Sequence, residues 1–395
     1  MDEVFKKIDE IALVNSKKVL EAFWKENLSE TDFNSTTGYG YGDIGRDKIE
    51  RIYSHIFKSE ASLVRNQFIS GTHAISTCLF ALLRPGDILL SITGKPYDTL
   101  DSVIGFNDNK SSLKSFGIKY KQVDLIDSKF DYEGIKKVLE EEKVKVVEIQ
   151  RSIGYSNRNT ISIDELENVI KYIKDIDKDV IVMVDNCYCE FVGVKEPIEV
   201  GADICVGSLI KNLGAGICEN GAYITGRKDL VYLCSERLNV AGEAWDVGPS
   251  LNANKMILKG LYFAPSVVAS ALKTNVYAAY HLEKLGFLVS PRSNEEKSDI
   301  VLKIVFNDKD KLIKFVSLIQ KNSAIDSFVS PMPSSMPGYD DEIIMASGSF
   351  TQGSSIELSC DGPIRSPYIA YLQGSLTFEY GRIAIDNIIE EMSKN

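Results

Sequence analysis

Val180-Ile181-Val182-Met183-Val184-Asp185 is a run of five apolar residues that ends on a carboxylate. Such a run predicts a buried strand with Asp185 at its carboxyl end. The later segment Gly207-Ser208-Leu209-Ile210-Lys211-Asn212 places a lysine three residues after a serine. Pyridoxal phosphate needs a carboxylate for its pyridinium nitrogen and an amine for a Schiff base. Together the two segments predict a binding site for this cofactor.

Each of these residues also has an ordinary explanation when it is considered alone. Lys211 could be a solvent-exposed lysine, and Asp185 could cap the N-terminus of a following helix. We favour the cofactor because an apolar, strand-like run precedes each residue. Since burial lowers the pKa of a lysine, we also expect the Lys211 amine to be freed for attack on an aldehyde.

A second feature is the alternation of short β-rich runs with helical stretches between about residues 60 and 230. This alternation predicts an α/β fold with a large, mostly parallel sheet that helices cover on both faces. Ligands of such sheets bind beyond the carboxyl ends of the strands, where Asp185 and Lys211 are expected. The expected strands are residues 63–68, 87–91, 118–123, 144–149, 180–184, 204–206 and 222–225.

The rest of the chain divides into an N-terminal arm and a smaller C-terminal domain. Apolar residues at helical spacing over 4–28 predict an amphipathic helical arm, residues 1–37, that packs on another element or on a partner subunit. The large cofactor-binding domain is then expected over 38–270 and a small α+β domain over 271–395. A long helix over 260–285, broken early by Pro265, is expected at their junction.

Within the small domain we expect strands at 300–305 and 355–359 and helices at 309–321 and 367–393. The stretch 330–354 is rich in proline, glycine and serine and is too long for a simple connection. Loops of this length often line active sites, so we expect this one to contribute to the cavity.

Composition and charge exclude several functional classes. The net charge of −11 and the lack of Lys and Arg clusters argue against nucleic acid as a partner. The N-terminus has no apolar stretch of signal or membrane-spanning length, so we expect a cytoplasmic protein without a membrane partner. Seven cysteines without a CxxC pair and only three histidines predict no metal site. Cys187 and Cys189 allow a redox interpretation, although two small buried hydrophobes near a strand end are the simpler one.

Two further segments could complete a cofactor site. Ser70-Gly71-Thr72-His73-Ala74 follows a predicted strand and opens a helix, so the Gly71 and Thr72 amides could bind a phosphate at the helix N-terminus. An ordinary serine or threonine cap explains this segment equally well. Tyr97 follows the strand at 87–91 and could stack on the cofactor ring, although the chain has 18 tyrosines.

Five motifs together are typical of one family. They are Phe68-Ile69-Ser70-Gly71-Thr72-His73-Ala74, Gly86-Asp87-Ile88-Leu89, Asp185-Asn186-Cys187-Tyr188, Ser208-Leu209-Ile210-Lys211-Asn212 and Asp361-Gly362-Pro363-Ile364-Arg365. With them the chain resembles the bacterial methionine gamma-lyase-like or aluminium-resistance proteins, a branch of the fold-type I pyridoxal phosphate enzymes related to cystathionine beta- and gamma-lyases. The resemblance extends from about Gly38 to Phe378.

The resemblance implies a role for each of the residues singled out above. It makes Lys211 the Schiff-base lysine and pairs Asp185 with the pyridine nitrogen. It implies that Ser208 and the amides of Gly71 and Thr72 hold the phosphate, and that Tyr97 stacks on the ring.

Other roles implied by the resemblance fall on residues far from these motifs. Relatives form dimers or tetramers with shared sites, in which a tyrosine and an arginine of the neighbouring subunit reach the phosphate, and Tyr41 and Arg46 are the counterparts here. An arginine of the small domain grips the substrate α-carboxylate. Arg365 is favoured over Arg382 for this role, and an ordinary surface arginine is the alternative.

The function implied is a pyridoxal phosphate-dependent carbon–sulfur lyase that carries out β- or γ-elimination on a small sulfur-containing amino acid. Lys211 would move the protons, and Tyr97 or Tyr41 would help the leaving group depart. The segment 348–354 and the loop after Lys211 depart from the relatives' pattern, which leaves the substrate open. An aminotransferase on the same fold, or a cofactor-binding stress-response protein with little turnover, are the alternatives.

Overall fold

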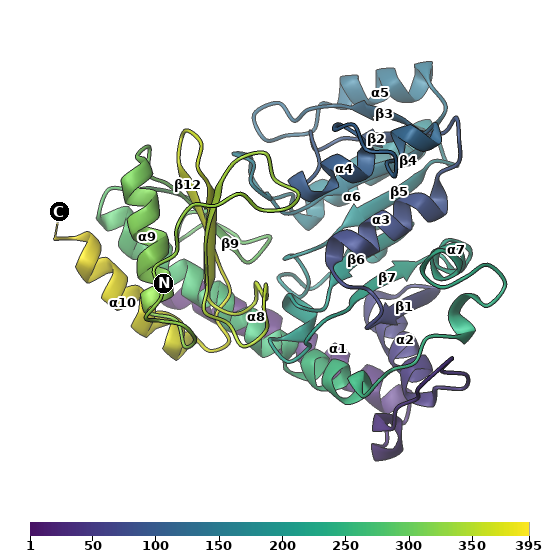
Figure 1. The fold of residues 1–395 in the computed structure, drawn as a ribbon, viewed down its shortest axis with the longest axis horizontal. Coiled ribbons are helices and arrows are strands. Elements are labelled where there is room, and N and C mark those ends of the chain that lie inside the picture. Colours follow the sequence, from purple (N-terminus) through teal and green to yellow (C-terminus); the bar gives the residue numbers. More distant parts are fainter. Residues whose placement is uncertain (395) are drawn as a thin grey trace.

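A sheet of seven strands forms the larger half of the computed structural model, which describes residues 1–394 (Figure 1). Its strand order is β1-β7-β6-β5-β4-β2-β3, and the neighbours from β6 to β3 pair in parallel, whereas β7 is antiparallel to both β1 and β6. The predicted α/β fold with a mostly parallel sheet is therefore confirmed. The strands are β1 Ala61–Arg65, β2 Ile88–Ser91, β3 Lys119–Gln122, β4 Val144–Gln150, β5 Ile181–Asp185, β6 Ile204–Ser208 and β7 Ala222–Gly226.

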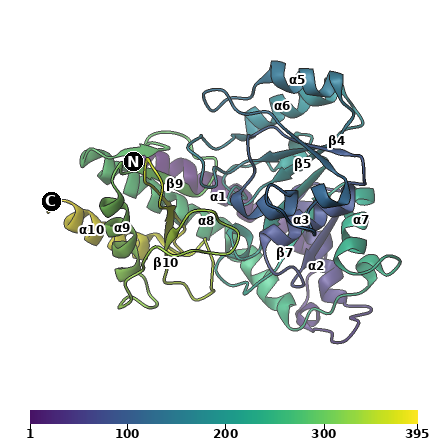
Figure 2. The same ribbon diagram turned by 45° about the horizontal axis from the view of Figure 1, so that its top comes forward.

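Helices cover both faces of this sheet, which explains why the central strand β5 is apolar from Ile181 to Val184. Met183 of β5 packs in one core with α3 and α7, whereas Val182 and Val184 pack in another with α5 and α6. Figure 2 shows α5 and α6 on one side of β4 and β5 and α3 on the other. The helices are α2 Ile44–Phe57, α3 Gly71–Leu82, α4 Asp101–Ile104, α5 Tyr132–Glu141, α6 Ile163–Ile176 and α7 Lys228–Leu238.

A helix of 32 residues, α8 (Ala253–Lys284), connects this sheet to the second one. The predicted break at Pro265 is wrong, because the helix continues through that residue. An internal proline costs about 3 kcal/mol, and the packing of Leu261, Ala264 and Val268, which are fully buried, outweighs that cost. By length and composition α8 could also cross a membrane, yet 61% of its most apolar window is buried inside the protein, as in a core helix.

The N-terminal helix α1 (Asp2–Lys25) lies along α8, beneath both sheets (Figure 1). Its Asn15 side chain donates hydrogen bonds to the carbonyl oxygens of Phe191 at 3.1 Å and Gly193 at 3.0 Å. The predicted arm therefore packs on the large sheet's own elements within one chain.

The second sheet has five antiparallel strands in the order β10-β11-β12-β9-β8. Its strands are β8 Leu288–Ser290, β9 Val301–Val305, β10 Ile343–Ser347, β11 Ser359–Pro363 and β12 Ile369–Gln373, and its helices are α9 Lys309–Lys321 and α10 Phe378–Met392. The predicted strand at 300–305 and helix at 309–321 are confirmed.

Three other expectations for this half are wrong. The strand predicted at 355–359 lies at 359–363, and the supposed loop at 330–354 contains β10. The helix predicted over 367–393 is divided into β12 and α10 by Gly374 and the N-cap residue Thr377. Residues 369–373 have no strong strand signal of their own, and their pairing with β9 on one side and β11 on the other decides their conformation.

The helix α8 contributes to both hydrophobic cores. Residues from Ala253 to Val276 pack with the large sheet, and Tyr277, Ala278, Ala279 and Leu282 pack with the small one. The expected domain boundary at residue 270 thus falls inside a continuous helix, and the division into domains stays a prediction.

Gly260 of α8 gives a test of this packing. A Cβ atom at Gly260 would lie 2.7 Å from the carbonyl oxygen of Gly214 and 3.1 Å from the Cys218 sulfur. We expect Gly260→Ala to lower the free energy of unfolding by about 1–3 kcal/mol, because the backbone of Gly214 must move. Thermal and urea unfolding measure this. Gly193→Ala is the matched control, since a Cβ atom there meets nothing within 4 Å; equal losses in both variants would contradict the account.

Candidate active site

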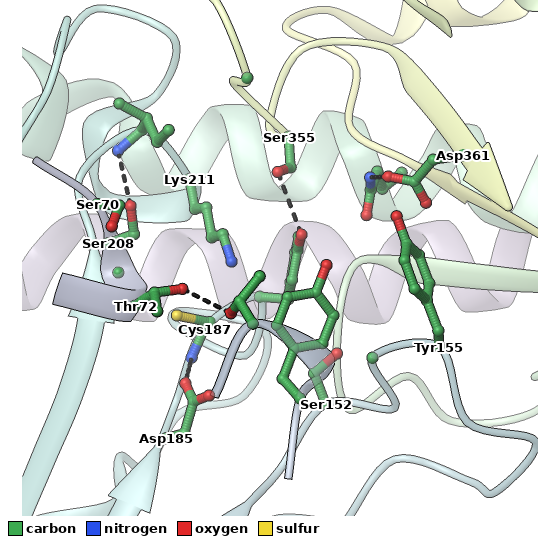
Figure 3. Close-up of a pocket in the computed structure, with 18 of the residues that line it drawn as sticks. Ser70, Thr72, Ser152, Tyr155, Asp185, Cys187, Ser208, Lys211, Ser355 and Asp361 are labelled. Atoms are coloured by element: carbon green, nitrogen blue, oxygen red, sulfur yellow. Dashed lines mark hydrogen bonds between the residues drawn. The ribbon is translucent and has the colours of Figure 1, made fainter. Parts of the chain in front are cut away.

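A cavity of about 220 Å³ lies where the carboxyl ends of β5 and β6 face the small sheet (Figure 3). Asp185 ends β5, Ser208 ends β6, and Lys211 follows three residues later. The opposite wall includes Asp361 of β11 and Gln373 of β12. The cavity therefore has the position that is expected for a ligand of a parallel sheet. Residues from both sheets line it: Ser70, Gly71, Thr72, Ile75, Tyr97, Thr99, Leu100, Gln150, Ser152, Gly154, Tyr155, Asp185, Cys187, Tyr188, Ser208, Ile210, Lys211, Tyr339, Met345, Ser347, Gly353, Ser354, Ser355, Ser359, Asp361 and Gln373.

The Lys211 amine projects into this cavity, with Nζ 3.8 Å from the centroid of the Tyr188 ring (Figure 3). Burial alone would lower the pKa of Lys211, but Cys187, Tyr188 and Asp185 outweigh burial and raise the pKa above its ordinary value. The expected low pKa of this lysine is therefore wrong. The amine is protonated at neutral pH, and its charge balances the carboxylate next to it.

Asp185 is buried at the end of β5, with 6% of its surface exposed. Burial raises the pKa of its carboxyl group, and the charge of Lys211 and a 3.0 Å hydrogen bond from the Cys187 amide oppose that shift. The interpretation of Asp185 as a helix cap does not hold, because a turn and not a helix follows it. Its side chain is free to meet a cationic nitrogen of a ligand.

The first turn of α3 borders the cavity beside Ser208. Ser70 caps the helix by accepting a 3.0 Å hydrogen bond from the His73 amide, whereas the Gly71 and Thr72 amides donate none within residues 1–394. A Cβ atom at Gly71 would lie 3.2 Å from Cβ of Ser208 and 3.4 Å from the Cys187 sulfur. This glycine keeps open a space where two amides and the Ser208 hydroxyl can bind an anion.

Four tyrosine rings form much of the remaining wall: Tyr97, Tyr155, Tyr188 and Tyr339. The Tyr97 and Tyr339 hydroxyl oxygens are 2.7 Å apart, and the Tyr97 ring lies 5.7 Å from that of Tyr155. Burial raises the pKa of Tyr97 well above its ordinary value, so its hydroxyl stays protonated. Tyr97 is thus in the cavity as predicted, and its ring is available for stacking.

Three residues predicted for the site lie outside the cavity of this chain. Tyr41 is 62% exposed, on a surface loop where it stacks on Tyr39 at 5.5 Å. The buried Arg46 guanidinium donates to the carbonyl oxygens of Gly40 at 2.7 Å and Gly248 at 2.9 Å. The roles of Tyr41 and Arg46 in a neighbouring subunit stay predictions.

Arg365 also lies outside the cavity. Its guanidinium pairs with Asp341 at 2.7 Å and donates to the Tyr155 carbonyl oxygen at 3.1 Å. No arginine is among the residues that line the cavity within the described chain. The role of Arg365 in substrate binding stays a prediction.

Sequence reasoning missed most of the wall that the small sheet provides. Asp361 belongs to the motif 361–365, from which only Arg365 was predicted to be a site residue. Because the predicted bounds of β11 and β12 were wrong, the sequence did not indicate that these strands face the cavity. Several buried polar atoms here have no hydrogen-bond partner within residues 1–394, namely Gln150 Oε1, Tyr155 Oη, Ser354 Oγ and Ser359 Oγ. Orphaned polar atoms around one cavity indicate a polar ligand.

Metal and thiol chemistry find little support in this region. No group of three or more His, Cys, Asp or Glu side chains suited to a metal ion occurs in the part of the chain that the structure describes. Cys187 and Cys189 are both buried, and burial raises the pKa of each thiol well above its ordinary value. Both are weak nucleophiles, which favours packing over redox chemistry.

Comparison with known proteins identifies the family. The family model described as methionine gamma-lyase matches residues 1–393. The chain belongs to this family. The Bacillus subtilis protein YnbB, itself described as uncharacterised, is 47% identical to the chain over 98% of this chain and 93% of its own length.

The chain is also similar to solved structures of other proteins. A carbon–sulfur lyase involved in aluminium resistance from Clostridium novyi is 47% identical, covers 99% of this chain and 92% of its own, and has a TM-score of 0.94. The pyridoxal 5′-phosphate-dependent protein YhfS from Escherichia coli shares 18% identity at a TM-score of 0.66, over 98% of this chain and 97% of its own. The second likeness confirms the fold-type I architecture alone.

Gly71 allows the anion site to be tested separately from the chemistry. We expect Gly71→Val to raise the dissociation constant for pyridoxal phosphate by about tenfold or more, because its side chain fills the space beside Ser208. Titration of the apoprotein, followed by the visible absorbance of the bound cofactor, measures this. Gly193→Val is the control for a valine in open space. Unchanged affinity in Gly71→Val would place the phosphate elsewhere.

Proposed function

We propose that this protein is a pyridoxal phosphate-dependent carbon–sulfur lyase that acts on a sulfur-containing amino acid. The observation that carries the proposal is the convergence of Lys211, Asp185 and the N-terminus of α3 on one cavity. When bound, the cofactor would supply an electron sink that stabilises negative charge on the substrate's Cα. The names of the close structural relatives support the same reaction class.

The residues present fit this cofactor well. Lys211 would hold it covalently, and Asp185 would keep its ring nitrogen protonated. The Gly71 and Thr72 amides and the Ser208 hydroxyl would bind the phosphate, and Tyr97 would cover the ring. The orphaned oxygen of Gln150, with 6% of the residue exposed, leaves an acceptor for a further polar group in the same cavity.

The reaction requires proton transfers at two positions. The Lys211 amine would take the proton from the substrate's Cα, because its Nζ lies in the cavity and the surrounding tyrosines stay protonated. The carbon–sulfur bond then breaks, and the sulfur leaves as a thiol after it has gained a proton. Water enters the overall reaction, so that the products are one thiol, one 2-oxo acid and one ammonium ion.

The test uses the holoenzyme and a panel of thioether amino acids. We expect wild-type protein to release thiol, 2-oxo acid and ammonium in equal amounts. Lys211→Ala should lose the visible absorbance of the lysine-bound cofactor and lower turnover by about a thousandfold or more. Lys228→Ala, which removes an exposed lysine, is the control.

Two results would reject the proposal. One is a Lys211→Ala protein that keeps the absorbance and the activity. The other is wild-type protein that passes the amino group to a 2-oxo acid and releases no ammonium, since this is the behaviour of an aminotransferase.

A further inference from the structure

Asp361 of β11 faces the cavity from the small sheet, across from Lys211 (Figure 3). Its Oδ2 accepts a long hydrogen bond of 3.3 Å from Gln373 Nε2, and the Tyr155 hydroxyl points toward the carboxylate. Burial raises the pKa of Asp361 to about 7, whereas Tyr155, Gln373 and the charge of Lys211 favour the carboxylate form. Asp361 is half-buried, and with so few hydrogen-bond donors its carboxylate is incompletely compensated.

No fixed cation neutralises this carboxylate. Asp361 forms no ion pair within residues 1–394, and Lys211 is the single Lys or Arg side chain among the residues that line the cavity. In the proposed function the cofactor engages Lys211, which leaves Asp361 without a positive neighbour. A cationic group of a ligand would pair with this carboxylate through a charge-assisted hydrogen bond.

The walls beside Asp361 suit an ammonium group. Tyr155 lies 5.7 Å from Tyr97 and 5.6 Å from Tyr339, measured between ring centroids. The face of a tyrosine ring attracts cations, and Lys211 already places its ammonium 3.8 Å from the Tyr188 ring in this cavity. The Tyr155 residue is 8% exposed, and its hydroxyl has no hydrogen-bond partner within the described residues.

We propose that Asp361, Tyr155 and the neighbouring tyrosine rings form a subsite for a positively charged group at the far end of the substrate's side chain. This inference rests on the proposed function and narrows its substrate class to thioether amino acids with a second, distal amino group. The α-amino group reacts at the Lys211 end of the cavity, so the cation that Asp361 meets must be a different one.

An isosteric pair of thioethers tests the subsite in the holoenzyme. S-(2-aminoethyl)-L-cysteine and S-propyl-L-cysteine differ only in a terminal ammonium in place of a methyl group. We expect kcat/KM for thiol release to favour the aminoethyl compound by about 10- to 100-fold, as a charge-assisted contact allows. In Asp361→Asn this preference should fall to near one, and Asp361→Glu should retain part of it.

Binding is measured separately with two ligands that cannot undergo carbon–sulfur cleavage. L-Lysine and L-2-aminoheptanoate have side chains of equal length, with and without the terminal charge. Calorimetry on the holoenzyme should show the same 10- to 100-fold preference for lysine, and Asp361→Asn should abolish it. Asp340→Asn, which removes an exposed carboxylate of the neighbouring loop, should leave the preference intact.

The outcomes separate the subsite from the lyase. Equal binding of lysine and 2-aminoheptanoate by wild-type protein overturns the subsite, whatever the activity. An equal loss of both thioether activities in Asp361→Asn, with lysine binding unchanged, also overturns it and makes Asp361 a proton donor. Selective, Asp361-dependent binding of lysine without thiol release from either thioether supports the subsite and rejects the lyase.

Discussion

The parallel pairing of β5 with β6 is the constraint on which the site depends. In this pairing Asp185 lies opposite Val206, so that the two strands end at the same edge of the sheet. Asp185 and the Lys211 that follows β6 therefore face one cavity without any long-range adjustment of loops. A shift in register by one residue would move each side chain of β5 to the opposite face of the sheet and disturb the packing of both cores. The backbone hydrogen bonds of one strand pair thus fix the distance between the two groups that the chemistry needs.

Around this pair the protein buries more acids than bases. Burial raises the pKa of Glu148 to about 7 and that of Glu190 to about 8. Glu190 accepts a 3.0 Å hydrogen bond from the Tyr223 hydroxyl, and Glu148 accepts one of 2.9 Å from Ser91. Because these pKa values lie near neutral pH, each of the two glutamates is protonated for part of the time. They can therefore lie close to Asp185 without adding two full negative charges. Lys211 and Arg158 supply positive charge to a region that is otherwise rich in acids.

The sequence was informative where local pattern and tertiary environment agree. The apolar runs of β5 and β6 predict strands from local pattern alone, and the residues that follow them are predicted at the edge of the sheet where the cavity lies. The small sheet is different, because Ile369 to Gln373 become a strand only through their partners on either side. The role of Asp361 could not be predicted from local sequence either. It depends on which face of β11 borders the cavity, and much of that cavity is formed by residues about 150 to 290 positions earlier in the chain. Arg365 shows the converse: it belongs to a recognisable motif, yet its guanidinium is held by Asp341 and the Tyr155 carbonyl oxygen.

The single helix α8 has a thermodynamic consequence for the whole molecule. Its first part lies in the core of the large sheet and its last turns lie in the core of the small one. Neither core can lose its share of α8 without exposing apolar surface in the other, so the two sheets are cooperative partners in folding and not independent units. A disturbance of either core is therefore transmitted through α8 to the other core and to the cavity between the sheets.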